Sequence, residues 1–399
     1  MRKSAVVATH MQQSLSDIEW LHGSMATLDD RPLMPFAEET IEQLNALSVA
    51  LLKNPLSRQY PDVVTFGFFC RRANLLKLKE QYVHAGLRIG RGMVFHIAPS
   101  NVPVNFAYSM VAGLLSGNTN VVRVSQKVFP QVDIIVKHMH EMGMERVAVV
   151  RYTHECEANE VFSAKCDVRV IWGGDATIAT IRKNALPARA FDICFADRYS
   201  LAVINADKLV NERDMDGLAL KFYNDTYLFD QNACSAPHLV VWLGDADSIV
   251  SAKEKFWSTL QQIIEQKYTF QDVMAVDKLT ALYRQAVAMP MHAEKTKDNL
   301  LCRVNIDLLP KDIDSFRCAS GYFTEYTAKN LDEIASIVTR KYQTLAYYGF
   351  EKEELKHFVL RNRLAGVDRI VPFGETTAFS LIWDGNDLIN TMSRIVDIL

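Results

Sequence analysis

The sequence predicts an α/β protein built from parallel sheets that are covered by helices. Short apolar runs rich in Val and Ile alternate with longer segments of helical periodicity, the order typical of strand–helix–strand crossovers. The clearest unit is residues 94–125: a strand, a proline-punctuated turn, an apolar helix, a Gly117-Asn118 stop and a second strand. A unit of this size joins parallel strands, because a parallel pair needs a crossover connection.

The other elements continue this alternation and then change rhythm near residue 210. In the first part we expect strands over 146–152, 167–172, 191–195 and 201–204, and helices over 131–142 and 176–184. In the second part we expect helices over 215–229, 249–266, 274–289 and 331–341, and strands over 239–242, 322–326 and 343–350. The change of rhythm predicts one domain over residues 1–208, a second over 209–350, and a segment 351–399 that returns to the first.

Charge and hydropathy exclude several classes of protein. The formal net charge is -3 over 399 residues, and Lys and Arg are spread along the chain without the basic stripe that nucleic acids or membrane surfaces require. No apolar run is long enough for a membrane span, and the one after Met1-Arg2-Lys3 is too short for a signal peptide. We therefore expect a cytoplasmic protein.

The cysteines and histidines favour neither a disulfide framework nor a metal site. Seven cysteines are an odd number and lack Cys-x-x-Cys spacing, so reduced thiols are expected. The fragments His138-Met139-His140 and His154-Glu155-Cys156 contain metal-ligand residue types. Neither fragment has partners at a suitable spacing, so we expect surface residues there and no bound metal.

Cys234 stands at a junction between a predicted helix and a predicted strand. It lies in the decapeptide Phe-Asp-Gln-Asn-Ala-Cys-Ser-Ala-Pro-His, residues 229–238. An ionised thiol is a strong nucleophile, so a cysteine at such a junction is a candidate for covalent catalysis. The alternative for any single cysteine is a small buried hydrophobe.

Asn101 follows the strand that ends near Ile97. In open α/β sheets ligands bind beyond the carboxyl ends of the strands, and residues 99–101 fall at such an end. The Asn101 amide is therefore a candidate site group. Its alternative role is to support the turn before Pro103.

Together these segments resemble the aldehyde dehydrogenase superfamily and, within it, the LuxC family of acyl-CoA reductases, the reductase component of bacterial bioluminescence. Residues 99–104, Pro-Ser-Asn-Val-Pro-Val, look like the superfamily's Pro-Trp-Asn-Phe-Pro, and residues 116–125 are similar to its Gly-Asn…Lys-Pro-Ser stretch. Residues 230–238 are close to the LuxC nucleophile segment, and residues 366–374 with 383–385 look like its carboxyl-terminal signature.

The resemblance covers about residue 60 to the end and implies an aldehyde dehydrogenase-like fold. Residues 1–208 are then an amino-terminal segment and a Rossmann-like nicotinamide-cofactor domain, and residues 209–350 an α/β catalytic domain that carries the cysteine. Residues 351–399 return to the cofactor domain and the oligomer interface.

The resemblance also implies a nicotinamide cofactor, although the chain has no Gly-x-Gly-x-x-Gly run; Gly90-Arg91-Gly92 precedes a strand instead of opening a helix. The residues expected to bind the cofactor are Ala98, Pro99, Ser100, Arg123, Ser125, Gly173 and Gly174. Gly173-Gly174 opens a helix, where glycine lets a pyrophosphate approach free N–H groups; an ordinary turn is the alternative. Arg123 falls where the superfamily has a lysine near the adenosine ribose. A guanidinium there favours NADPH over NADH, unless Arg123 is an exposed strand-end arginine.

The chemistry that the resemblance implies begins at Cys234. Its thiolate attacks an acyl thioester, with the Asn101 amide and the Cys234 backbone N–H stabilising the oxyanion. The acyl-enzyme is then reduced, so the expected reaction converts an acyl-CoA, with a fatty acyl chain, to the aldehyde. His238 and Phe229 are candidate substrate-binding residues, and a structural role for His238 is the alternative.

One departure from the superfamily favours a reductase. Hydrolytic aldehyde dehydrogenases carry a Glu-Leu-Gly-Gly stretch, whereas residues 191–198 read Phe-Asp-Ile-Cys-Phe-Ala-Asp-Arg. Without a base that acts on water, the acyl-enzyme survives long enough to be reduced. Asp192 and Asp197 are the remaining candidates for such a base. The superfamily's Glu-x-Phe-Gly-Pro segment has no clear counterpart, and residues 314–317 are the nearest match.

Partners and other functions stay open. The resemblance implies a homodimer or homotetramer, with the alternating stretch 76–94 and the final tail as contributors, and an acylated partner protein of the acyl-protein synthetase type. The alternative functions are a cysteine-dependent acyl transferase or acyl-carrier subunit without hydride transfer, a CoA-acylating aldehyde dehydrogenase acting oxidatively, and a non-catalytic subunit. Five aromatic residues line an acyl tunnel or belong to the core: Phe106, Tyr108, Phe222, Tyr223 and Tyr227.

Overall fold

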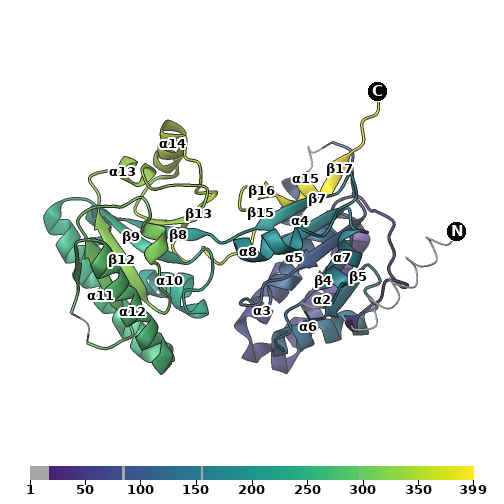
Figure 1. Cartoon of the computed structure of the whole chain (residues 1–399), viewed down its shortest axis with the longest axis horizontal. Helices are drawn as coiled ribbons and strands as arrows, with labels where there is room; N and C mark the ends of the chain where they lie inside the picture. Colours follow the sequence, from purple (N-terminus) through teal and green to yellow (C-terminus); the bar gives the residue numbers. More distant parts are fainter. Residues whose placement is uncertain (1–17, 83–85, 154–155, 296) are drawn as a thin grey trace. The chain divides into compact units, whose positions relative to one another are not determined.

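The computed structural model describes residues 18–82, 86–153, 156–295 and 297–399, which divide into two compact units (Figure 1). The first unit comprises the described residues up to Ala196 together with Leu381–Leu399, and the second comprises Asp197–Ser380. Each unit contains one large sheet. The predicted α/β class is confirmed.

The first unit is built on a six-stranded sheet in the order β1-β5-β4-β3-β6-β7. Its strands are β1 Glu19–His22, β3 Met93–Ile97, β4 Thr119–Arg123, β5 Val147–Arg151, β6 Val168–Trp172 and β7 Phe191–Phe195. Strand β1 is antiparallel to β5, and the other neighbours are parallel. Strands β3 and β4 are buried at every position, as expected when helices cover both faces of a parallel sheet.

The helices of the first unit cover this sheet. They are α2 Glu38–Lys53, α3 Pro61–Phe69, α4 Arg72–Glu80, α5 Asn105–Leu115, α6 Pro130–Glu141, α7 Ala158–Ser163 and α8 Asp175–Ile181, with the 3-10 turn η1 Pro55–Gln59. Helix α5 makes the crossover from β3 to β4 that the sequence predicts. Residues 76–80 belong to α4, so the alternating stretch 76–94 is not a continuous strand.

The carboxyl-terminal segment returns to the first unit (yellow in Figure 1). Strand β17 (Ser393–Ile395) pairs with β2 (Arg88–Gly90), and the short hairpin β15 (Ile382–Trp383) and β16 (Asn386–Asp387) precedes helix α15 (Leu388–Met392). Arg88 Nη2 donates to the Asn390 carbonyl at 2.6 Å, and Asn118 Nδ2 donates to the Met392 carbonyl at 2.9 Å. These contacts fasten the segment to the edge of the unit.

The second unit contains a seven-stranded sheet in the order β10-β11-β12-β9-β8-β13-β14. Its strands are β8 Tyr199–Asn205, β9 Pro237–Leu243, β10 Met291–Ala293, β11 Cys302–Ile306, β12 Tyr322–Thr327, β13 Tyr342–Tyr348 and β14 Arg369–Pro372. All neighbours are parallel except β10, which is antiparallel to β11. The helices are α9 Ala206–Leu209, α10 Met215–Thr226, α11 Ala246–Lys267, α12 Asp272–Ala288, α13 Asp332–Ala335 and α14 Lys352–Asn362, with the 3-10 turns η2 Tyr227–Phe229 and η3 Ile313–Phe316.

Successive residues of the second sheet enter cores on opposite faces. Ala202 and Ile204 pack with α10 and α11, whereas Leu201 and Val203 pack with α13 and α14. This alternation follows from the two-residue period of a strand. Phe222, Tyr223 and Tyr227 are buried in the first of these cores, so they are core residues.

The boundaries differ from the predicted ones. The chain divides after Ala196 and after Ser380, whereas the sequence placed the divisions after residues 208 and 350. Strands β8 and β14 account for the difference, because both pair with β13 of the second sheet. The predicted helix 331–341 is wrong beyond Ala335, since the β-branched residues 337–339 that follow disfavour a helix.

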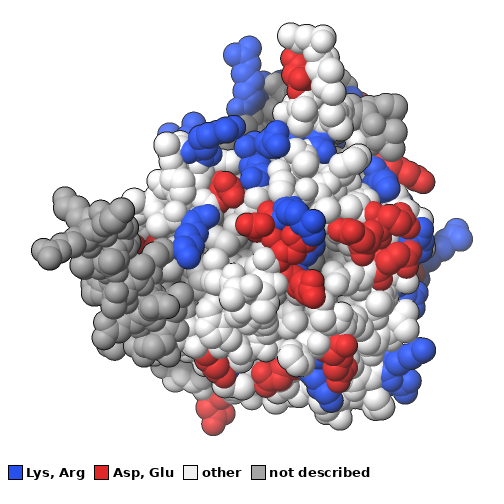
Figure 2. All heavy atoms as spheres, turned by 90° about the vertical axis from the view of Figure 1, so that its right-hand side faces the viewer, with Lys and Arg blue, Asp and Glu red and all other residues white. Residues whose placement is uncertain are grey.

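The surface carries no dominant charge on the face drawn in Figure 2, where acidic and basic side chains are interspersed among uncharged ones. Within the described ranges, no helix has the length and apolarity needed to cross a membrane. No disulfide and no metal-binding group of three or more His, Cys, Asp or Glu occurs among these residues. His138 is bonded to Asn54 and Glu141, whereas His154 and Glu155 lie outside the described residues.

Candidate active site

Cys234 lies in the loop between η2 and β9, and its side chain is exposed. Two left-handed residues precede it: Asp230 has φ 51° and Gln231 has φ 60°. Non-glycine residues adopt this conformation only where their surroundings fix it, so the turn that carries the cysteine is held in a defined shape.

The Gln231 side chain clamps this loop from inside the second unit. Its Nε2 donates to the carbonyls of Pro237 at 2.8 Å and Tyr322 at 3.2 Å. Its Oε1 accepts from the backbone N–H groups of Gly321 at 2.9 Å and Tyr322 at 3.2 Å. The bond to Pro237 connects the residues before and after Cys234. The other three bonds connect this loop to the start of β12. Nothing in the sequence indicates this role beyond the presence of a glutamine close to the cysteine.

Ser200 holds the backbone of Cys234 itself. Its Oγ donates to the Cys234 carbonyl at 2.6 Å and accepts from the Thr344 N–H at 3.1 Å. Ser200 is on β8 and Thr344 is on β13, so two central strands fix the peptide of the cysteine. Because the Ser200 hydroxyl donates one hydrogen bond and accepts another, it links the Cys234 peptide to Thr344.

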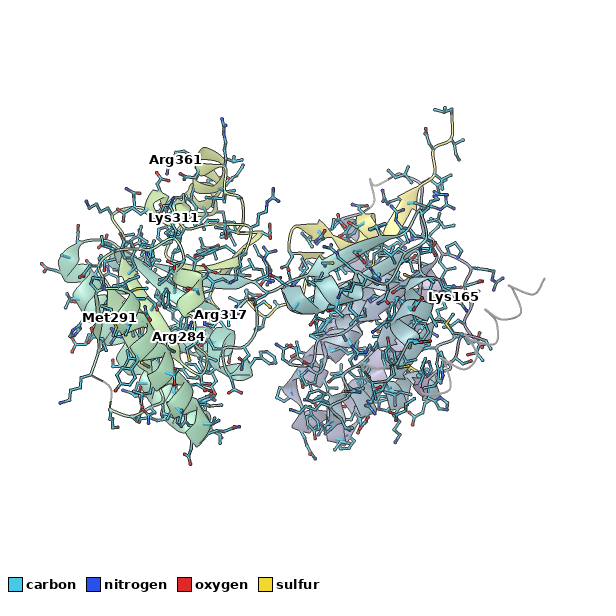
Figure 3. All side chains as sticks on the ribbon, in the orientation of Figure 1. Lys165, Arg284, Met291, Lys311, Arg317 and Arg361 are labelled. Atoms are coloured by element: carbon cyan, nitrogen blue, oxygen red, sulfur yellow. The ribbon has the colours of Figure 1, made fainter. Side chains whose placement is uncertain are left out.

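The segment after η3 supports the same loop. The Ser320 N–H donates to the Asp230 carbonyl at 2.9 Å. Arg317, labelled in Figure 3, donates from Nη2 to Asp197 Oδ1 and from Nη1 to the Arg198 carbonyl, each at 2.7 Å. The loop is therefore tied to β12 on one side and to the start of the second unit through this segment.

His238 is buried beneath the loop and does not carry a charge at neutral pH. Burial, reinforced by the nearby Arg317 guanidinium, lowers the pKa of His238 to about 4. Its Nδ1–H donates to the Cys318 carbonyl at 3.0 Å, and its ring stacks on Tyr199. These contacts favour the structural role for His238, because a neutral imidazole supplies no positive charge to a thiolate. Phe229, the other predicted substrate-binding residue, is half-buried at the end of η2.

Asp225, on the helix that leads to Cys234, is a buried acidic residue that the sequence analysis did not identify. It is buried in α10, and its carboxylate accepts hydrogen bonds from Gly374 N at 2.7 Å, Thr376 N at 3.0 Å and Thr376 Oγ1 at 2.8 Å. Burial raises the pKa of Asp225 to about 6. The helix that leads to Cys234 is thereby joined to the turn at the end of the 366–374 signature. The sequence feature that could have identified Asp225 is an acidic residue between the aromatic residues of a predicted helix.

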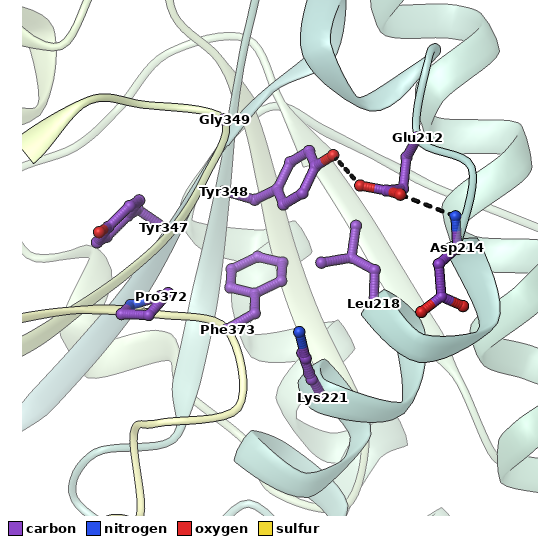
Figure 4. A pocket seen from close by; sticks show the side chains of 9 residues that line it. All are labelled: Glu212, Asp214, Leu218, Lys221, Tyr347, Tyr348, Gly349, Pro372 and Phe373. Carbon is purple, nitrogen blue, oxygen red and sulfur yellow. Dashed lines mark hydrogen bonds between the residues drawn. The ribbon is translucent and has the colours of Figure 1, made fainter.

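A cavity of about 210 Å³ also opens in the second unit, between the start of α10 and the ends of β13 and β14 (Figure 4). None of the residues predicted for the site lines it. Glu212 is held there by Tyr348 Oη and the Asp214 N–H, and the bond from Tyr348 keeps the pKa of Glu212 below its usual range. Glu212 is an anionic structural group in this wall.

The residues predicted to bind the cofactor follow three adjacent parallel strands of the first unit. Ala98, Pro99, Ser100 and Asn101 follow β3, Arg123 and Ser125 stand at and after the end of β4, and Gly173 and Gly174 follow β6. These segments therefore share the carboxyl edge of one sheet. Ser100, Asn101 and Gly174 are exposed there, and a Cβ added to Gly174 would meet no atom within 4 Å.

Arg123 is buried, not an exposed residue at the end of a strand. Its guanidinium carbon lies 5.0 Å from the centre of the Tyr152 ring. Its Nε is buried and has no hydrogen-bond partner among the described residues. An unsatisfied guanidinium N–H at the edge of this sheet is suited to an anionic group.

Both aspartates considered as bases are held in ion pairs. Asp192 binds Arg169 Nε at 2.7 Å and Arg182 Nε at 3.2 Å in the first unit. Asp197 binds Arg317, as described above, and lies 3.9 Å from Lys341 Nζ in the second unit. Arginine side chains therefore occupy oxygens of both carboxylates.

Sequence comparison places the chain in a family. A family model described as acyl-CoA reductase (LuxC) matches residues 6–395. The chain belongs to the LuxC family of acyl-CoA reductases. The predicted resemblance is confirmed.

Curated relatives of this LuxC chain are distant. A long-chain acyl-protein thioester reductase of Vibrio harveyi is 22% identical over 331 residues, 79% of this chain and 65% of that protein. Long-chain acyl-protein thioester reductase 2 of Photobacterium leiognathi is 23% identical over 178 residues, 43% of this chain and 35% of that protein. The chain thus spans less than two thirds of the length of these relatives.

Solved structures confirm the aldehyde dehydrogenase fold. Aldehyde dehydrogenase 21 of Physcomitrella patens, in complex with succinate, matches with a TM-score of 0.63 at 10% identity, covering 90% of this chain and 84% of that one. A Thermus 1-pyrroline-5-carboxylate dehydrogenase with bound NAD matches with a TM-score of 0.58 at 13% identity, covering 87% and 75%.

Proposed function

We propose that this LuxC chain reduces an acyl thioester to an aldehyde with NADPH, through a covalent acyl-enzyme on Cys234. The observation that carries the proposal is the exposed Cys234 on a loop whose backbone Gln231 and Ser200 fix. A nucleophile held in one position lowers the entropic cost of attack on a carbonyl.

In the proposed mechanism the chain's own residues form and protect the acyl-enzyme. Cys234 Sγ attacks the thioester carbonyl, the C–S bond to the leaving thiol breaks, and the acyl group remains on Cys234. The Asn101 amide and the Cys234 backbone N–H are the proposed donors to the oxyanion. Asp192 and Asp197 are engaged by cations, which supports an acyl-enzyme that is not hydrolysed.

The residues at the edge of the first sheet fit a nicotinamide dinucleotide. Gly174 leaves open space for a phosphate, and the unsatisfied Nε of buried Arg123 suits a 2′-phosphate, which supports NADPH over NADH. Ala98, Pro99, Ser100, Ser125 and Gly173 would complete the binding surface. When bound, the cofactor supplies the hydride that reduces the acyl group.

The proposed substrate is a long acyl chain on CoA or on an acylated protein. Two relatives are named long-chain acyl-protein thioester reductases, and the family model is described as an acyl-CoA reductase. Both descriptions imply a thioester substrate. Transfer of its acyl group to Cys234 forms a second thioester, so the step changes the free energy little. We expect the acyl group to be a fatty acyl chain.

The test is NADPH oxidation with a panel of acyl-CoAs and an acylated carrier protein. Replacing Cys234→Ala is expected to lower turnover at least ~10³-fold, because the covalent intermediate is lost. Cys156→Ala is the control and should keep the parent rate. Turnover by Cys234→Ala equal to the parent would overturn the assignment of the nucleophile.

Labelled acyl-CoA separates the other functions. If the parent becomes acylated but never oxidises NADPH, the chain is an acyl transferase or acyl carrier. If it forms acyl-CoA from aldehyde, CoA and NADP⁺ but shows no reduction, it acts as a CoA-acylating dehydrogenase.

A further inference from the structure

The cavity in the second unit lies at the edge of the sheet opposite to Cys234. It opens beyond the carboxyl ends of β13 and β14, where Tyr348 and Phe373 line it. Cys234 precedes the amino end of β9, and β9, β8, β13 and β14 are parallel neighbours. The cavity is therefore separate from the proposed acyl site.

This edge of the sheet is where the order of the strands reverses. After β8 the chain adds β9 on one side, and it later adds β13 on the other side of β8 and β14 beyond β13. Helices α9 and α10 pack on one face of the sheet, and α14 packs on the other. In open α/β sheets such a reversal leaves a crevice beyond the carboxyl ends of the strands, where ligands bind. The topology therefore favours a ligand at this cavity.

The apolar part of the lining suits a small apolar group. Leu218 and Phe373 are largely buried in the core and border the cavity, and the ring centre of Tyr348 lies 6.3 Å from that of Phe373. The volume of about 210 Å³ is below the roughly 300–1,000 Å³ of pockets for drug-sized ligands. The expected ligand is therefore a small molecule.

Two carboxylates stand at the start of α10. Glu212 accepts from Tyr348 Oη at 2.5 Å and from the Asp214 N–H at 2.8 Å. Asp214 Oδ1 in turn accepts from the Gly217 N–H at 3.0 Å. These bonds hold both side chains in place, and a carboxylate oxygen with one such bond can accept another. This end of the cavity suits an ammonium group.

Lys221 brings a positive charge to the same cavity. Its stem lies on the turn after β14, since a Cβ added to Gly374 would come 3.0 Å from Lys221 Cγ. In Figure 4, Leu218 lies between Lys221 and the two carboxylates. Among the residues that the structure describes, neither Glu212 nor Asp214 forms an ion pair with Lys221. Opposite charges that line one cavity without pairing leave room for a ligand that carries both.

We propose that this cavity binds a small zwitterion with an apolar side chain, that is, a free amino acid. Its ammonium group contacts Glu212 and Asp214, and its carboxylate contacts Lys221. Its apolar side chain packs on Leu218 and Phe373. For a ligand of this size we expect a dissociation constant on the order of 1 mM.

Three probes that share a phenyl ring test both charges. Free phenylalanine carries both charged groups, phenethylamine lacks the carboxylate, and 3-phenylpropanoate lacks the ammonium group. The dissociation constants are measured by ligand-observed NMR titration of the full chain. Phenylalanine is expected to bind about tenfold or more tightly than either of the other probes, because only it satisfies both ends of the cavity. Equal affinity for phenylalanine and either of the others would overturn the proposal.

Two charge-removing substitutions test the place of binding. Lys221→Gln and Glu212→Gln are each expected to weaken phenylalanine binding about tenfold, and thermal unfolding of each variant checks that the fold is kept. Lys352→Gln is the matched control, since Lys352 is also an exposed lysine on a helix of the second unit, and should bind like the parent. Parent affinity in both Lys221→Gln and Glu212→Gln would overturn the assignment of this cavity. No thioester or NADPH is present in these titrations, so their result stands apart from the proposed function.

Discussion

At the scale of single residues, the position of Cys234 depends on hydrogen bonds that link its loop to distant parts of the second unit. Gln231 reaches Tyr322, and Ser200 joins the cysteine peptide to Thr344. Both residues are proposed to act by positioning, since neither is a nucleophile in the mechanism.

Gln231→Ala is expected to lower kcat about 10- to 100-fold with little change in KM, because displacement of the nucleophile by less than an ångström is costly. The rate at which iodoacetamide alkylates Cys234, followed by peptide mass spectrometry, should change with it. Gln285→Ala is the matched control, since Gln285 is also a buried amide that contacts Tyr322. If both variants lose the same share of kcat, Gln231 has only a structural role.

His238 makes a second prediction at this scale, because its folded-state pKa of about 4 lies below the unfolded value of about 6.5. The neutral ring then contributes stability that is fully present above pH 6.5 and is lost as the pH falls through 4. The full difference corresponds to about 3 kcal/mol. His238→Asn keeps a donor for the Cys318 carbonyl and should lose less stability between pH 7 and pH 4 in urea unfolding. Parallel pH profiles for parent and variant would contradict this account.

At the scale of elements, α10 is held to the turn at residues 374–376 by one buried carboxylate. Three donors converge on Asp225, so its removal leaves the N–H groups of Gly374 and Thr376 without their acceptor. This bond set is the clearest link between the helix before Cys234 and the carboxyl-terminal signature.

Asp225→Ala is expected to destabilise the second unit by about 2–4 kcal/mol, through lost hydrogen bonds and buried unsatisfied donors. Amide hydrogen exchange should quicken in residues 372–378. Asp216→Ala, an exposed aspartate on the same helix, should change stability by less than about 0.5 kcal/mol. Equal effects of the two substitutions would show that the buried contacts of Asp225 are unimportant.

At the scale of the whole molecule, the two units have separate cores, and the chain enters the first unit twice. Residues 381–399 contribute β17 and the acceptors for Arg88 and Asn118. The second unit is a single continuous segment with its own sheet.

Truncation after residue 380 is therefore expected to lower the stability of the first unit and to leave that of the second unit unchanged. Hydrogen exchange measured along the truncated chain should quicken in residues 86–92 and 116–120 and stay at the parent rate in β8, β9 and β12. Uniform acceleration throughout the chain would mean that the two units unfold together.

The sequence alone determined the features that are encoded over short distances. Apolar runs, turn residues and helical periodicity predicted most strands and helices, including residues 191–195, which form β7 over the same span. The order of four short motifs predicted the family, because motif residues are close together in the chain. Cys234 was found in this way, at a junction that the structure preserves.

Only the tertiary structure decided which distant groups meet. Gln231, Asp225 and His238 each make a hydrogen bond to a residue 80 or more positions away, Gly321, Gly374 and Cys318 respectively, and no local pattern predicts these pairs. The helix over residues 274–289 was predicted, but the contacts of its buried side chains were not, because those contacts are made with distant residues. Lys278 and Gln285 of α12 are buried because Asn299, Leu300, Tyr322 and Thr324 offer hydrogen-bond partners there, and those partners are in place only once the sheet has formed.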